Sequence, residues 1–383
     1  MLRSIYDTDH EDFRTSVRAF VRNAIEPHDE RFAHEGRLDR ELWRAAGALG
    51  LLGLCVAEEY GGMGVDDYRF NAVMDEELTR AGLAYACALG IHTHVVSQYL
   101  TKRTTEEQRQ RWLPGFCSGD IVTAVGMSEP AGGSDLAGLQ TRATLDGDQW
   151  VVNGSKIFIT NGASADLIVT AVRTEPTTGR DGISLIAVDG NSPGLHRGKL
   201  LHKVGQHQGD TAELFFDEVR VPADNLIGVR GEGFGYMMEH LAQERLASAV
   251  CNITHAQHVL EMTRDYVSTR QAFGASIGSL QHIRFRMADL VTEVDIAQSY
   301  VDACVDAHVR GELTPIDAAK AKLKTSDLQN EVVDACVQMH GGYGYMQESA
   351  VARAWQDARV TKIWAGSNEI MREVIGRSLQ LRG

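Results

Sequence analysis

The sequence lacks an excess of basic residues, and this absence excludes several classes of protein. The 383-residue chain carries 38 Lys and Arg against 52 Asp and Glu, which gives a formal net charge of −14. Nucleic-acid binding and polybasic attachment to anionic lipid both depend on positive charge. We therefore expect no nucleic-acid partner and no electrostatic attachment to a membrane surface.

The sequence also lacks a long hydrophobic run and any CxxC pair. The longest stretch without a formal charge, residues 81–101, contains two His among other polar side chains, whereas a membrane span needs about 20 apolar residues. The N-terminal segment has no apolar core, so we do not expect a secretory signal. The six cysteines are scattered, which is typical of reduced side chains in a cytoplasmic protein.

No metal site is expected from the histidine pattern. His196, His202 and His207 lie close together in the sequence. Their spacing does not place them on one helix face, and no Cys or acidic residue completes a familiar zinc pattern. We therefore interpret them as unrelated loop histidines.

The hydrophobic pattern divides the chain into three parts. Residues 1–120 have the spacing of amphipathic helices. Residues 121–228 change to short β-branched and aromatic runs without alternating helices, which favours an antiparallel barrel or sandwich over a parallel sheet. Residues 229–383 return to the helical period in four segments, as in a four-helix bundle. The sequence thus predicts an α+β multidomain protein with a helical, a β and a second helical domain.

One turn is predicted inside the β domain. The apolar runs 150–152 and 157–159 flank Asn153 and Gly154. An Asn-Gly pair tolerates the positive φ of a tight turn, so the pattern predicts a β-hairpin centred on these two residues.

Three further segments could bind a ligand, and residue types alone leave each with a structural alternative. The Gly/Ser-rich segment 125–135 suits a phosphate or a flavin ring edge, or it is a plain surface turn. Arg270 could pair with a pyrophosphate, or it could simply end a helix. The glycines of segment 338–344 either end a helix or let another molecule approach the backbone.

Five ordered motifs stand out along the chain: 127–135 (MSEPAGGSD), 153–162 (NGSKIFITNG), 270–274 (RQAFG), 338–344 (QMHGGYG) and 363–370 (IWAGSNEI). Taken together, they resemble the motifs of the acyl-CoA dehydrogenase family from end to end, and the C-terminal run is similar to the long-chain type. The resemblance implies that family's arrangement of a helical, a β and a second helical domain. It also implies FAD-dependent oxidation of a medium- or long-chain fatty acyl-CoA to the trans-2-enoyl-CoA in β-oxidation, electron transfer to an electron-transfer flavoprotein, and a homotetramer.

The resemblance also implies which residues contact FAD. Many family members have Trp where this chain has Phe158. The positions that match flavin-ring contacts, or the turn beside them, are Val125, Met127, Ser128, Gly133, Ser134, Phe158 and Thr160. The positions that match other FAD contacts, in the family often contributed by a neighbouring subunit, are Arg270, Phe273 and Gln281. The positions that match pyrophosphate and adenosine contacts are Gln338, Gly341, Gly342, Ser367 and Glu369.

Dehydrogenation next to a thioester needs a base for the α proton, and a carboxylate in an apolar pocket suits this task because burial raises its pKa. Many family members carry this Glu directly before the Gly of the last motif, where this chain has Ala365. A branch that includes the long-chain and isovaleryl enzymes carries it on the first helix of the C-terminal domain, where this chain has Glu244. The resemblance therefore implies that Glu244 is the base, and the alternative is an ordinary helix Glu paired with a neighbouring Arg.

The same resemblance implies contacts with the acyl-CoA. The backbone N–H of Ala365 is expected to hydrogen-bond the thioester oxygen. Two other functions remain as alternatives: a flavin oxidase or monooxygenase of the same fold, and a non-catalytic flavin-binding protein. Some same-fold oxidases and monooxygenases lack the base, so Glu244 argues against them, and the acidic charge balance together with this candidate base argues against the non-catalytic protein. The expected substrate contacts are Ser134, Arg245, Trp364, Ala365 and Arg377.

Overall fold

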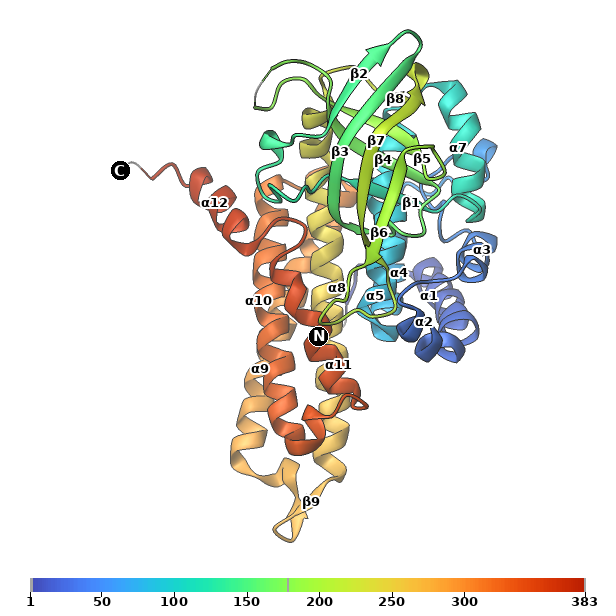
Figure 1. Cartoon of the computed structure of the whole chain (residues 1–383). Coiled ribbons are helices and arrows are strands. Elements are labelled where there is room, and N and C mark those ends of the chain that lie inside the picture. Colours follow the sequence, from blue (N-terminus) through green and yellow to red (C-terminus); the bar gives the residue numbers. More distant parts are fainter. Residues whose placement is uncertain (1–2, 178, 382–383) are drawn as a thin grey trace.

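The computed structural model describes residues 3–177 and 179–381 and begins with a set of helices, as predicted (Figure 1). Local capping explains where several of them start. The Asp7 side chain accepts hydrogen bonds from the backbone N–H groups of Asp9 and His10, and Thr105 forms a capping box with Gln108. The helices are α1 (Thr8–Phe20), α2 (Asp29–Glu35), α3 (Arg40–Ala48), α4 (Tyr68–Ala81), α5 (Leu83–Gly90), α6 (Ser97–Lys102) and α7 (Glu106–Ser118), with the π-helical turn η4 (Ile91–Val96) between α5 and α6.

The middle of the chain forms a sheet with the strand order β6-β7-β3-β2-β4-β5-β8, with β1 paired to β4. Most neighbours are antiparallel, as expected, but β1 and β2 each run parallel to β4. The sheet is therefore mixed. The strands are β1 (Thr123–Gly126), β2 (Arg142–Asp146), β3 (Gln149–Thr160), β4 (Leu167–Arg173), β5 (Ile183–Asp189), β6 (Leu195–Leu200), β7 (Thr211–Pro222) and β8 (Leu226–Ile227).

The predicted hairpin at Asn153 and Gly154 is wrong. Strand β3 runs straight through both residues, and the chain turns before it, at Gly147 (φ 63°). Gly154 instead marks a register shift against β7. A side chain does not fit at position 154, because a Cβ there would lie 2.5 Å from Thr141 Oγ1.

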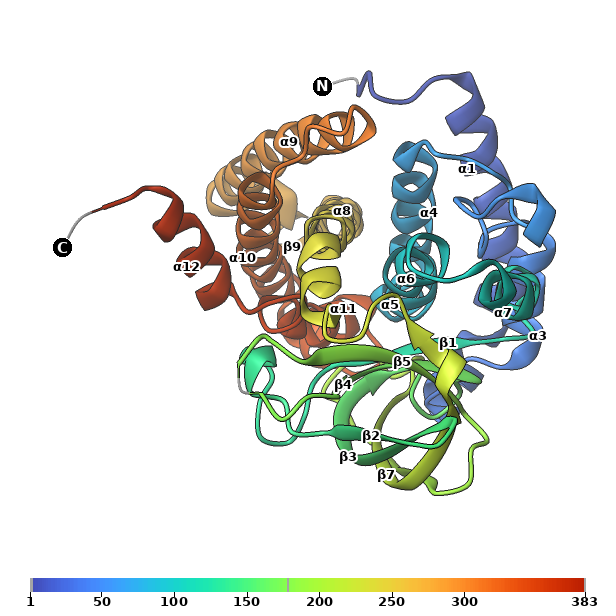
Figure 2. The same cartoon turned by 90° about the horizontal axis from the view of Figure 1, so that it is seen from above.

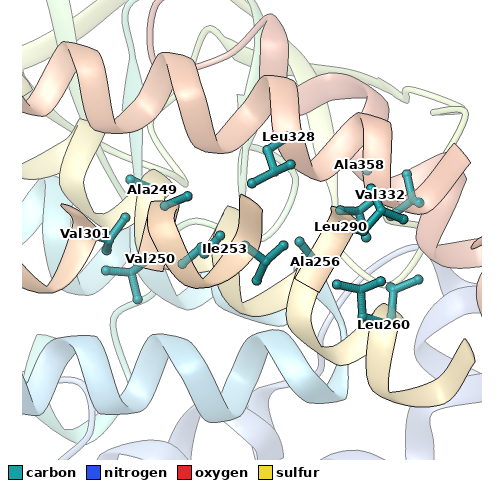
Figure 3. Close-up of a cluster of buried hydrophobic side chains, with 14 of the residues drawn as sticks. Ala249, Val250, Ile253, Ala256, Leu260, Leu290, Val301, Leu328, Val332 and Ala358 are labelled. Carbon is teal, nitrogen blue, oxygen red and sulfur yellow. The ribbon is translucent and has the colours of Figure 1, made fainter. Parts of the chain in front are cut away.

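The C-terminal part is built around three long helices, and α8 lies between α4 on one side and α9 and α10 on the other (Figure 2). Aliphatic side chains such as Ile253 from α8, Val301 from α9 and Leu328 from α10 meet in its core (Figure 3). The predicted bundle is confirmed, although its fourth segment is short. The elements are α8 (Gly233–Thr269), β9 (Gln271–Ala272), β10 (Ala275–Ser276), α9 (Gln281–Val309), α10 (Pro315–His340), α11 (Ala350–Ala358) and α12 (Asn368–Ser378).

Helix α8 joins the parts of the molecule. Its 37 residues correspond to about 55 Å at 1.5 Å per residue. One end starts beside the sheet, and the other end reaches the small β9–β10 hairpin at the far tip of the bundle (Figure 1). Within residues 3–177 and 179–381, no helix is both long and apolar enough to cross a bilayer.

Candidate active site

A cavity of about 310 Å³ lies where the sheet meets the helices. Its walls come from α4, α5, η4, β1, β3, α8 and the loop before α12. Segments far apart in the sequence therefore converge on one space. The predicted site residues that line it are Val125, Met127, Ser128, Gly133, Phe158, Thr160, Glu244, Trp364 and Ala365.

The carboxyl group of Glu244 faces this cavity from α8. Its Oε1 atom is buried and has no hydrogen-bond partner among the described residues. Burial raises the pKa of Glu244 to about 7, although the charges of Arg245 and His94 partly oppose the shift. No ion pair joins Glu244 to Arg245 in the part of the chain that the structure describes. The group is thus a desolvated carboxyl that can gain and lose a proton near neutral pH.

Lys322 holds the loop that carries Trp364 and Ala365. Its Nζ donates hydrogen bonds to the carbonyl oxygen of Gly366 (2.7 Å) and to Asn368 Oδ1 (2.9 Å). Burial lowers the pKa of Lys322 to about 8, and the nearby charge of Arg245 acts in the same direction. Sequence reasoning missed this residue, because its partners lie more than 40 positions away.

Ala365 has a left-handed backbone with φ 51°. This conformation is costly for a residue with a Cβ and is often found at functional sites. The Ala365 N–H has no hydrogen-bond partner within the described ranges. A main-chain donor at the cavity wall is therefore free for a ligand oxygen.

A buried ion pair joins the first two motifs in the β domain. Lys156 Nζ lies 2.8 Å from Glu129 Oε1 and donates a second hydrogen bond to the Met127 carbonyl oxygen. The other Glu129 contacts are the backbone N–H groups of residues 140 and 141. The pair fixes the Gly/Ser-rich segment against β3, where the Phe158 ring is 67% exposed. A lysine inside an apolar strand pattern was the sequence signal for this contact.

A second, more open cavity of about 470 Å³ lies at the far tip of the bundle. The Arg270 guanidinium lies 5.4 Å from the centre of the Tyr343 ring, and it has no acidic partner among the residues described. A Cβ built on Gly341 or Gly342 would meet nothing within 4 Å, so the backbone is open to an approaching molecule. An unpaired cation beside open backbone suits a phosphate group. The predicted FAD residues that line this cavity are Arg270, Gln338, Gly341 and Gly342.

The two cavities are far apart in one chain. Glu244 lies on α8 and Arg270 directly follows its end, and the two residues are 26 positions apart, which corresponds to about 39 Å. This separation exceeds the length of a dinucleotide, so one FAD cannot touch both groups of predicted residues in the same chain. Phe273, which is 94% exposed, and Gln281 also lie at the far tip.

The remaining predicted residues occupy varied places. Arg245 is buried, with Nη2 beside Gly366. Ser367 caps α12 by accepting a hydrogen bond from the Ile370 N–H. The other three are exposed and lie outside the lining of both cavities: Ser134, Glu369 and Arg377.

Family models for the acyl-CoA dehydrogenase N-terminal, middle and C-terminal domains match residues 7–120, 124–219 and 231–380. The long-chain specific acyl-CoA dehydrogenase of Sus scrofa is 40% identical over 99% of this chain and 88% of its own length. The acyl-CoA dehydrogenase structure from Geobacillus kaustophilus has a TM-score of 0.97 at 40% identity, covering 99% of this chain and 100% of that one.

A more distant relative was solved with a reduced flavin. The Mycobacterium smegmatis glutaryl-CoA dehydrogenase, in complex with FADH2, has a TM-score of 0.91 at 25% identity, covering 98% of this chain and 95% of that one. The sequence-based fold and family predictions are therefore confirmed. This chain belongs to the acyl-CoA dehydrogenase family of flavin-dependent oxidoreductases that act on CH–CH bonds.

Proposed function

We propose that this protein is an FAD-dependent acyl-CoA dehydrogenase that converts a medium- or long-chain acyl-CoA into the trans-2-enoyl-CoA, and that Glu244 is its base. One observation carries the proposal. An unpartnered carboxyl with a pKa of about 7 lines the same cavity as the residues that match flavin-ring contacts. A base whose pKa lies near the working pH is well matched to abstraction of a carbon-bound proton.

The chain's own groups divide the chemistry between them. Glu244 takes the proton from the carbon next to the thioester. The free N–H of Ala365 stabilises the negative charge that develops on the thioester oxygen, because a main-chain donor does not depend on the side chain at this position. Lys322 positions that donor through Gly366. When bound, FAD supplies the two-electron acceptor for the hydride from the next carbon.

The residues of this chain fit FAD if two copies of the chain contribute to each binding site. The first cavity offers apolar walls and Thr160 for the flavin ring, whereas Arg270 and the open glycines 341 and 342 offer a cation and free backbone for the pyrophosphate. Because about 39 Å separates the two groups along α8, a second copy must supply one of them. The proposal therefore includes a homotetramer, in which exposed Phe273 meets a neighbouring copy, and an electron-transfer flavoprotein as acceptor.

Anaerobic titration of the flavin-loaded protein with short, medium and long straight-chain acyl-CoA thioesters tests the proposal. We expect the flavin absorbance to bleach, with the highest kcat/KM for medium or long chains. Failure of every thioester to bleach the flavin would overturn the proposal. Fast reoxidation of the substrate-reduced protein by O2 would instead favour an oxidase of the same fold.

A further inference from the structure

One wall of the first cavity is polar, and the proposed reaction does not use it. Asp75 from α4 and His94 from η4 both line the cavity, and their exposed fractions are only 1% and 2%. His94 Nε2 lies 2.8 Å from Asp75 Oδ1. Burial raises the pKa of Asp75, and the contact with His94 opposes the shift. Buried polar atoms are almost always hydrogen-bonded, so any unpaired atom of this pair needs an explanation.

Each member of the pair keeps one hydrogen-bonding atom vacant. Asp75 Oδ2 and His94 Nδ1 are both buried and have no partner among residues 3–177 and 179–381. A carboxylate can only accept, so Asp75 Oδ2 is a vacant acceptor, and His94 Nδ1 is a second vacant polar atom in the same pair. The pair therefore presents a vacant acceptor and lacks a donor for it.

Ser248 extends this polar wall along α8. It follows Glu244 by one helical turn and lies on the same helix face, and it also lines the cavity. Its Oγ atom is buried without a partner in the described chain. Asp75 acts electrostatically on Cys251, a further turn along the same face. The polar wall thus begins one to two turns beyond the proposed base.

A saturated acyl chain would leave these polar groups without a hydrogen-bond partner. The surrounding wall from Leu83, Ala86 and Ala247 is apolar and suits a hydrocarbon. However, methylene groups packed against Asp75 and His94 would leave Asp75 Oδ2 and His94 Nδ1 buried without a hydrogen-bond partner, which proteins rarely tolerate. A site built to bind a hydroxyl discriminates strongly against the analogue that lacks it.

We propose that the natural acyl group carries a hydroxyl several carbons beyond the thioester, and that this hydroxyl donates to the Asp75–His94 pair while Ser248 donates to its oxygen. The inference rests on the proposed dehydrogenase function and specifies its substrate class. A keto group at the same position lacks the donor that the pair requires. The substrate class is therefore a hydroxylated acyl-CoA, distinct from both the unsubstituted and the keto acyl-CoA.

The test compares acyl-CoA thioesters of one chain length in the flavin-loaded native protein. One is unsubstituted, a series carries a single hydroxyl moved along the chain from the fourth carbon outward, and a keto counterpart is made for each position. We expect one hydroxylated isomer to exceed both the unsubstituted and the matching keto thioester by about 10- to 100-fold in kcat/KM. Binding of the corresponding hydroxy-enoyl product, measured by calorimetry, should show the same order.

Two variants connect that preference to the pair. The double variant Asp75→Leu/His94→Phe removes the polar atoms of the pair, so we expect the ratio of kcat/KM between the hydroxylated and the unsubstituted thioester to fall to about one. Asp75→Asn replaces an acceptor with a donor and should move the preference toward the keto thioester, which gives a test even if the double variant does not fold. Thr93→Val is the matched control, because the Thr93 hydroxyl, in η4, donates to the Leu89 carbonyl oxygen of the preceding α5 and should not affect selectivity.

The outcomes separate this inference from the function on which it rests. If the native protein oxidises the unsubstituted thioester as well as every hydroxylated isomer, ordered water satisfies the pair and the inference is wrong, whereas the dehydrogenase function stands. If Asp75→Asn and the double variant both keep the hydroxyl preference, the pair is not its source. If no thioester of any kind bleaches the flavin, the proposed function itself fails.

Discussion

The replacement Glu244→Gln tests the proposed base most directly. Gln keeps the size and shape of the side chain and can still donate a hydrogen bond, but it cannot accept a proton at any working pH. General bases contribute roughly 10²- to 10⁴-fold to a rate. Glu244 is desolvated, has an unpartnered Oε1 and has a pKa of about 7, which places it toward the upper part of that range. We expect the rate of anaerobic flavin reduction to fall by about 10³-fold.

The pH dependence supplies a second, independent signature of the same group. Below a pH of about 7, Glu244 is increasingly protonated, so the native rate should fall about tenfold for each further pH unit. The rate falls at low pH because only the ionised carboxylate can accept the proton. In Glu244→Gln the small residual rate should lose this dependence, because no titrating base remains.

Stopped-flow absorbance under anaerobic conditions measures both effects. Glu239→Gln is the matched control, because Glu239 lies on the same helix, is exposed and pairs with Arg103 at the surface. This control should reduce flavin at the native rate. The reasoning is refuted if Glu244→Gln bleaches as fast as the native protein, or if the native rate is flat from mildly acidic to mildly alkaline pH.

Three further predictions concern stability and cofactor retention. The pKa of Glu244 rises from near 4.5 in the unfolded chain to about 7 in the fold, so ionisation of this group destabilises the fold as the pH rises between these values. Glu244→Gln should therefore be more stable than the native protein by up to about 3 kcal/mol at pH 8 and equally stable at pH 4. Equal unfolding temperatures at pH 8 would contradict this. Glu129→Gln leaves Lys156 buried without its counter-charge and should lower the free energy of unfolding by about 3–5 kcal/mol in denaturant titrations. Arg270→Ala should lower the flavin-to-protein ratio after gel filtration, whereas Arg264→Ala, which removes an exposed Arg from the same helix, should not.

The order of structural classes along the chain could be predicted from the sequence because hydrophobic period is a local property. A 3.6-residue period and a two-residue period differ within a dozen residues, and each part of this chain keeps one of them. The hairpin at Gly154 was mispredicted because an Asn-Gly pair indicates a positive φ but does not show whether the glycine forms a turn or lies within a strand. Here the glycine accommodates Thr141 beside a continuous strand, and that neighbour is set by sheet pairing.

The candidate site was predictable only in part, for a similar reason. Glu244 and the cavity-lining motifs were found through ordered motifs that resemble a family. The supporting pairs were missed, because Lys322 with Gly366 and Asp75 with His94 join residues that are 44 and 19 positions apart. A weak signal existed for Lys156, which directly precedes the apolar run 157–159, but Asp75 begins a run of three acidic residues and does not stand out in the sequence. Charge inside an apolar pattern indicates that a partner exists but not which residue it is.

A base on a long helix has a consequence that a base on a loop would not have. Glu244 and Ser248 project from one face of α8, which is packed between α4 and α10, so their spacing is fixed by helix geometry at about 6 Å. A carboxyl on the loop at residue 365 could shift with that loop, and the polar wall could not follow it. Because the proposed base and Ser248, one of the proposed hydroxyl contacts, lie on one rigid element, α8 fixes the distance between the reacting carbons and this contact. One hydroxyl position should therefore be preferred sharply over its neighbours, and a preference spread evenly over several positions would contradict this reasoning.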